Sequence, residues 1–269
     1  MRRGSFFWGS LILLVGLLLL VNNLFPGMFN GVGIWNIIWP LVIVVIGVWF
    51  LVGRSMGARN VETQQISVPL ESATDADVHL YHGAGRLNLR AAETPGLLVS
   101  GSCVGGADVN VSRSGSSMRL DLRSKAADYA FGFPAVDATY GFSWDLVMTP
   151  EVPLRLALET GASENILDLR DLKVTDFELK TGASSSTVTL PARAGMTRVK
   201  VSSGASAVKL LLPDGVAGHI QVQSGLAGIT IDQNRFPPSG SGYETPGYAD
   251  AANKIDIFVE TGVGSVEVR

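Results

Sequence analysis

A short motif that recurs at a nearly constant spacing constrains this chain more than any other feature of its sequence. Thr or Ser is followed by Gly and then by a small or apolar residue. A period near 21 residues is typical of solenoids, in which each repeat forms one layer and stacks on the next. The glycines of the five copies, spaced 21, 22, 21 and 37 residues apart, are Gly161, Gly182, Gly204, Gly225 and Gly262, and Gly83 marks an earlier copy with His82 in place of Thr or Ser.

The residues around each glycine alternate between apolar and polar. Apolar side chains stand three and five residues before every glycine and six residues after it, whereas the position four residues before is mostly polar. This period of two is typical of strands with one buried face. We therefore expect an all-β, single-stranded solenoid over residues 70–269, in which each rung of about 21 residues supplies two short strands and neighbouring rungs stack so that their backbone groups pair.

The glycine of each motif is expected at the corner of its rung. Because glycine lacks a Cβ atom, it can adopt positive φ or let adjacent rungs approach closely. The Thr or Ser before it can hydrogen-bond locally, which favours a structural role for this column over a binding ladder.

Two stretches interrupt the repeat. Gly83 and Gly161 lie 78 residues apart, and the 37 residues from Gly225 to Gly262 include a turn-rich segment at 234–243. Loops that project from a scaffold often carry binding sites, and the ends of a solenoid need cover for their strand edges. An aromatic segment in the longer stretch is thus predicted either to contact a partner or to cap the solenoid, through Phe131, Phe133, Tyr140, Phe142 and Trp144.

The first part of the chain has a different character. Although 17% of all residues are charged, there is no Asp, Glu, Lys or Arg from Ser5 to Gly53. Apolar runs at about 6–25 and 34–52 are each close to the ~20 residues that a membrane-spanning helix needs. We predict a transmembrane helical hairpin at residues 1–54 and a linker at 55–69. This composition excludes a wholly soluble protein, a multi-span transporter and a basic nucleic-acid binder.

The positive charges next to the predicted hairpin indicate its orientation. Arg2 and Arg3 precede it, Arg54 and Arg59 follow it, and its connecting loop has no charge. Because positive residues favour the cytoplasmic side, both termini are expected in the cytoplasm of a two-pass protein of the bacterial cytoplasmic membrane. The alternative for the first run is a cleaved signal peptide, but no small-residue cleavage site follows it.

The sequence offers little material for catalysis or metal binding. It has three histidines and one cysteine, and His79 and His82 are expected on opposite faces of one strand. Cys103 is expected to be a small core residue. We predict no enzyme, no catalytic residue, no metal and no cofactor.

The chain resembles a known family in two places. The segment 37–49 resembles the membrane part of LiaF-like proteins of bacterial cell-envelope stress systems, and segments 152–163 and 262–268 resemble the toast-rack β-solenoid domain of such proteins and of adhesins. The resemblance implies a membrane-anchored regulator that acts through protein contact, in the best-known case on a sensor histidine kinase. It transfers no catalytic residue.

Three functions remain open at this point. The leading hypothesis is a non-enzymatic accessory or regulatory protein of an envelope stress response, whose partners are membrane lipid and another membrane protein. The second is an exported adhesin-like or envelope-binding module, and the third is an enzyme of unrecognised type. Whether copies of the solenoid associate with one another also remains open.

Overall fold

The computed structural model describes residues 63–93, 95–125 and 142–269, which form one sheet of thirteen strands. The predicted hairpin helices, Phe131, Phe133 and Tyr140 lie outside the described residues. Within the described ranges, no helix is both long and apolar enough to cross a membrane. The hairpin therefore stays a prediction.

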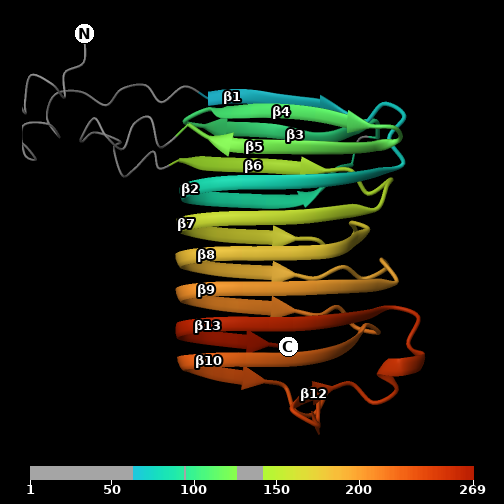
Figure 1. Ribbon diagram of the computed structural model, residues 1–269, viewed down its shortest axis with the longest axis vertical. Helices are drawn as coiled ribbons and strands as arrows, with labels where there is room; N and C mark the ends of the chain where they lie inside the picture. The colour runs from blue at the N-terminus through green and yellow to red at the C-terminus, as the bar shows by residue number, and fades with distance from the viewer. Residues whose placement is uncertain (1–62, 94, 126–141) are drawn as a thin grey trace, which may run out of the picture. The chain divides into compact units, whose positions relative to one another are not determined.

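Six long strands form the body of the solenoid and confirm the predicted all-β fold (Figure 1). Each runs without a break through its motif glycine, so the two short strands expected per rung are the two halves of one bent strand. The halves form two walls, and alternate side chains point between them. These strands are β2 (Asp75–Ala91), β7 (Leu154–Asp168), β8 (Val174–Thr189), β9 (Met196–Leu211), β10 (Ala217–Ile231) and β13 (Lys254–Val268).

The rungs pair in parallel, but their order differs from the order in sequence. The stack runs β2-β7-β8-β9-β13-β10, so the last two rungs in the sequence exchange places in the stack. The last strand, β13, inserts between β9 and β10. Its inward side chains are all essentially buried, which suits a strand covered on both sides; they are Ile255, Ile257, Val259, Val266 and Val268.

The long interval after Gly83 builds the first end of the stack. The first half of β2 pairs with β5, which pairs with β4, whereas the second half pairs with β6, which pairs with β3 and then β1. Each wall is thus extended separately. These strands are β1 (Thr63–Pro69), β3 (Leu97–Val104), β4 (Ala107–Ser114), β5 (Ser117–Ser124) and β6 (Ser143–Met148), and β1 lies in the stretch expected as a linker.

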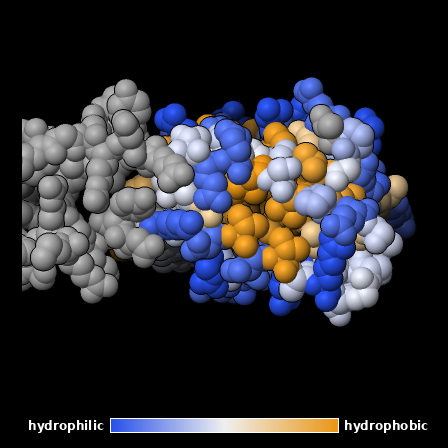
Figure 2. All heavy atoms as spheres, turned by 90° about the horizontal axis from the view of Figure 1, so that it is seen from above, coloured by the Kyte–Doolittle hydropathy of each residue, from blue (hydrophilic) through white to orange (hydrophobic). Residues whose placement is uncertain are grey.

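Seen from this first end, apolar side chains gather in the middle of the domain and hydrophilic side chains lie around them (Figure 2). This distribution follows from the period-two alternation of the strands, since inward positions are apolar and outward positions polar. The core is continuous along the stack.

The second interruption of the repeat covers part of the other end. It contains β11 (Pro238–Ser239), β12 (Gly242–Glu244) and the short 3₁₀ helix η2 (Tyr248–Asp250). Phe236 is fully buried, and Arg235 donates hydrogen bonds to the carbonyls of Leu212, Pro213 and Val216. Strand β12 of this cap pairs with β10 only at His219 and Ile220, and Thr245 hydrogen-bonds to Gly218 of β10 just before them.

Candidate functional site

The six motif glycines form one column along the corner of the solenoid. A Cβ atom on Gly161 would lie 2.4 Å from the carbonyl oxygen of Gly83, and one on Gly182 would lie 2.9 Å from that of Gly161. The same close approach continues through Gly204, Gly262 and Gly225 at 3.0, 2.7 and 2.8 Å. None of the six has positive φ, so at the five glycines after Gly83 the requirement for glycine is the close approach of adjacent rungs.

The polar residues before these glycines form a second column, which faces inward. Thr160 donates a hydrogen bond to Thr181 across 3.0 Å, and Ser203 donates one to Thr261 across 2.9 Å. Asn165 adds a bond of 2.9 Å to Ser186 from the other side of the corner. These side chains hydrogen-bond to one another inside the walls, although Asn165 Oδ1 has no partner among the described residues, and the pairing supports the structural role expected for the column.

His82 occupies this column at the first end of the stack. It is fully buried, and its ring lies 4.9 Å from that of Trp144, centre to centre. Neither ring nitrogen of His82 has a hydrogen-bond partner in the described part of the chain. Burial therefore lowers the pKa of His82 from 6.5 to about 4, because the charged form loses its hydration. His79, on the same strand, instead faces outward, and its Nε2 lies 3.2 Å from Oδ1 of Asp77.

The two described aromatic residues of the predicted contact segment have packing roles. Trp144, in β6, is fully buried against His82. Phe142 lies against Gly105, where its ring fills the space that a Cβ atom would need, and its carbonyl accepts a hydrogen bond of 2.8 Å from the Arg86 N–H. Both residues thus help to close the first end of the stack.

Cys103, also in this end, is buried, and burial together with the charge of Asp145 raises the pKa of its thiol to about 12.

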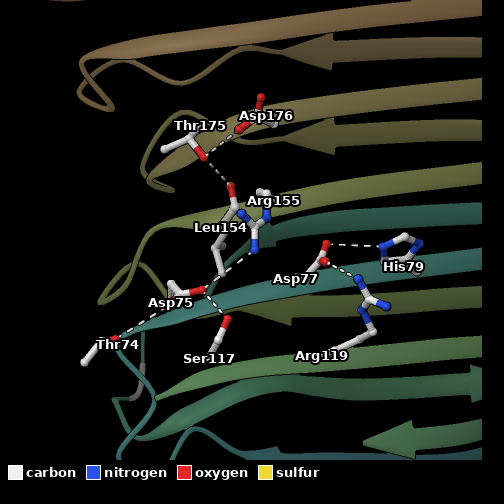
Figure 3. Close-up of polar contacts among 10 residues, drawn as sticks. All are labelled: Thr74, Asp75, Asp77, His79, Ser117, Arg119, Leu154, Arg155, Thr175 and Asp176. Atoms are coloured by element: carbon white, nitrogen blue, oxygen red, sulfur yellow. Dashed lines mark hydrogen bonds and ion pairs between the residues drawn. The ribbon is translucent and has the colours of Figure 1, made fainter. Parts of the chain in front are cut away.

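A ladder of alternating charges crosses the outer face of the wall formed by the first halves of the rungs. Arg119 donates to Asp77 across 2.9 Å, and Arg198 donates to Asp176 across 3.3 Å (Figure 3 shows part of the ladder). From β5 to β10, the residues at this register are Arg119, Asp77, Arg155, Asp176, Arg198, Asp256 and His219.

The ladder perturbs its best-connected carboxylate. Burial alone would raise the pKa of Asp77, but the hydrogen bond from Arg119 and the positive charges of His79, Arg119 and Arg155 outweigh it and hold the pKa below its ordinary value. The ladder also matches the strand order. Asp256 of β13 lies between Arg198 and His219, whereas stacking β10 directly on β9 would place those two side by side. The alternation is present in the sequence at the position five residues before the motif Thr, Ser or His in each rung, but it is not among the predicted features.

The same face holds a shallow depression of about 460 Å³. It lies where the small side chain of Ala157 stands between its longer register neighbours His79 and Glu178. Several of the charges around it pair with one another, as Asp176 does with Arg198. This arrangement suits contact with a complementary charged surface better than proton transfer. No group of three or more metal-ligating side chains gathers in the described ranges.

Comparison with solved structures shows which known protein shares this fold. The chain is similar to the solved structure of a candidate cell adhesion protein from Clostridium sporogenes ATCC 15579, with a TM-score of 0.69 and 17% sequence identity over 77% of this chain and 98% of that one. At this identity, the likeness shows the fold alone. A candidate adhesin from Bacteroides fragilis NCTC 9343 aligns over 77% of this chain and 97% of that one at 7% identity, but its TM-score of 0.23 carries no argument.

No curated protein matches the sequence. A family model does match, from residue 57 to residue 211. The matched segment begins just before β1 and ends with β9, so it includes the first end of the stack and four of the six rungs. Since this segment exceeds half of the sequence, the chain belongs to the family described as the N-terminal domain of toast_rack, DUF2154.

Proposed function

We propose that this protein is a membrane-anchored, non-enzymatic accessory or regulatory protein of a bacterial cell-envelope stress response, and that it acts by protein contact. One observation carries the proposal. A charge-free apolar stretch, Ser5 to Gly53, directly precedes a toast-rack domain whose match begins at residue 57. A stretch of this length accommodates two spans, and a solenoid this close to a membrane is well placed to meet membrane proteins.

The surface of the solenoid supports a role in contact. Its outer face carries a long ladder of complementary charges and a shallow depression with paired charges. Extended, regular surfaces of this kind are what solenoid proteins use to bind other proteins. The LiaF-like resemblance of segment 37–49 supports a partner within the membrane, such as a sensor histidine kinase.

Photocrosslinking of the full chain in living cells tests the regulatory proposal. A photoreactive amino acid placed in the second predicted span, at Ile43, is expected to capture one membrane protein, and the same probe at Thr187, in the middle of the stack, serves as the matched control. Mass spectrometry identifies the captured protein. Capture of lipid alone by the Ile43 probe, in both resting cells and cells under envelope stress, would refute the regulatory proposal.

The second candidate function is an exported adhesin-like or envelope-binding module. The fold shared with the candidate cell adhesion protein, over nearly all of that chain, favours it. The two functions place the solenoid on opposite sides of the membrane. Fusions of alkaline phosphatase or of a fluorescent protein after Arg269 distinguish them, because the phosphatase is active only outside the cytoplasm. We expect fluorescence without phosphatase activity, and the reverse result would favour the adhesin-like function.

A further inference from the structure

One edge of the solenoid is left without a partner strand. β10 pairs with β13 along its whole length on one side, but on the other side β12 reaches only His219 and Ile220. From Gln221 to Ile231, no described strand pairs with this outer side, and we call this segment the free half of β10. It exposes a row of backbone N–H and C=O groups that can pair with another strand.

The free half of β10 also exposes positions that belong to the core elsewhere in the stack. Ile229 is 41% exposed, although its register partners Val266 and Val208 are 1% and 2% exposed. Val222 and Ile231 are likewise only partly buried, although their register partners in β13, Val259 and Val268, are fully buried. Leu226 is 82% exposed at an outward position next to the corner glycine, where its register partner Val263 is exposed as well. The apolar interior of the solenoid is therefore open to solvent here, as at an interface that awaits one more layer.

The charge of β10 differs from that of the other rungs. β10 contains no Asp, Glu, Lys or Arg, whereas each of the other five rung strands contains at least two. The edges at the opposite end are protected, since β1 ends in Pro69 and β4 carries Asp108 and Arg113. Proteins usually prevent edge pairing with such charges and prolines. Their absence from β10 indicates an edge that is kept available for pairing.

We propose that the free half of β10 is the site at which two copies of this chain associate, with the two β10 strands side by side and antiparallel about a two-fold axis. An uncharged edge meets its own copy without placing like charges together. The apolar side chains Val222, Ile229 and Ile231 of both copies then cover each other, which closes both solenoids. A two-fold interface of this kind is self-complementary and closed, so it yields a dimer and not a fibre.

The cap is compatible with this arrangement. Its strand β12 pairs with β10 only near the beginning of β10, and it lies away from the bend of β10 (Figure 1). A two-fold axis through the free half places the cap of each copy beyond the corner of the other. The inference concerns the solenoid end alone and does not depend on the proposed regulatory function or on the side of the membrane.

Cysteine crosslinking of the full chain in its native membrane tests the proposal. Thr230→Cys places a thiol at the free edge, and Thr187→Cys places one at the equivalent register position in the middle of the same wall, as the matched control. The native Cys103 is buried and stays unreactive. With a flexible bismaleimide, Thr230→Cys is expected to give at least tenfold more of a species at twice the 28.5 kDa chain mass than Thr187→Cys.

A second substitution tests whether the contact is specific. Leu226→Lys in the Thr230→Cys background adds a like charge to both copies at a side chain that is mostly exposed, so it leaves the fold intact. It is expected to reduce the crosslinked dimer at least tenfold. Equal crosslinking of Thr230→Cys and Thr187→Cys, crosslinking of Thr230→Cys only to a different protein, or a dimer yield unchanged by Leu226→Lys would each overturn the proposal.

Discussion

Acid is expected to destabilise the solenoid through His82. This side chain is neutral in the folded protein because its pKa is lowered from 6.5 to about 4, whereas in the unfolded chain it regains the ordinary value. Between these two pH values the unfolded state binds more protons, so the free energy of unfolding falls as the pH falls. The stabilisation is complete above about pH 6.5 and is lost on acidification towards pH 4.

The size of this loss follows from the two pKa values. One pKa unit corresponds to about 1.4 kcal/mol, so His82 is expected to contribute a loss of about 2 kcal/mol by pH 5 and about 3 kcal/mol by pH 4. Since domains are stable by only ~5–15 kcal/mol, a loss of this size is readily measured. The buried Trp144 ring and the absence of a hydrogen-bond acceptor at either ring nitrogen within the described ranges explain why the protonated form is so unfavourable.

The assay compares the full chain with His82→Phe in mild detergent, by urea unfolding followed through the circular dichroism of the sheet from about pH 7 to about pH 4. Phe keeps a ring against Trp144 but cannot be protonated. The variant should lose about 3 kcal/mol less than the native chain over this range. Protonation of carboxylates such as Asp77 also destabilises the protein in acid. This contribution is the same in both proteins, so it cancels in the difference between their free energies of unfolding.

A matched control is His79→Phe, which removes an outward-facing histidine on the same strand. It should retain nearly all of the acid sensitivity of the native chain. If His82→Phe and the native chain lost the same free energy between pH 7 and pH 4, the explanation by burial of His82 would be refuted.

Three further predictions concern the stack and its cap. Gly161→Ala should lower the unfolding free energy by ~1–3 kcal/mol in urea titrations, because its Cβ atom would meet the Gly83 carbonyl, whereas Gly83→Ala, with open space at its own Cβ, should cost less than half as much. A double-mutant cycle of Arg198→Ala and Asp256→Ala should give a coupling free energy of unfolding of about a few tenths of a kcal/mol, because the two residues are register neighbours. The cycle of Arg198→Ala with His219→Ala should give no coupling, since β13 lies between them, and coupling only in this second cycle would contradict the order β9-β13-β10. Phe236→Ala should lower the free energy of unfolding by ~3–5 kcal/mol, because the Phe236 ring is fully buried. It should also speed amide hydrogen exchange in β12 and at its partners His219 and Ile220, while β7 and β8 stay protected. Unchanged exchange at these positions would argue against Phe236 as the anchor of the cap.

Much of the rung architecture could be predicted from the sequence. The motif glycines and the alternating apolar residues around them are local features, repeated in register, and each follows from the needs of a stacked strand. Glycine at 161, 182 and 204 reports a close approach between backbones, and that approach recurs once per rung. The inward positions report burial on one face. Such signals survive in the sequence because every rung has the same neighbours above and below.

The ends of the stack were less predictable, because there the neighbours change. Trp144 could be interpreted as a partner contact or as a cap, and only its burial against His82 decided for packing. The charge alternation that places Asp256 between Arg198 and His219 was present in the sequence. It can be recognised only when different strand orders are compared, since each outward residue by itself looks like an ordinary solvated residue.

By itself, the sequence determined that this protein has a charge-free N-terminal stretch and a repetitive all-β domain, because the length of an apolar run and the period of burial are properties of the chain. Only the tertiary structure decided the order of the rungs, the insertion of β13 and the exposure of the free half of β10. Those depend on pairing between strands that are far apart in the sequence, which no local pattern records. β13, apolar inside and charged outside, is stable between two neighbours, and the uncharged β10 is left at the edge.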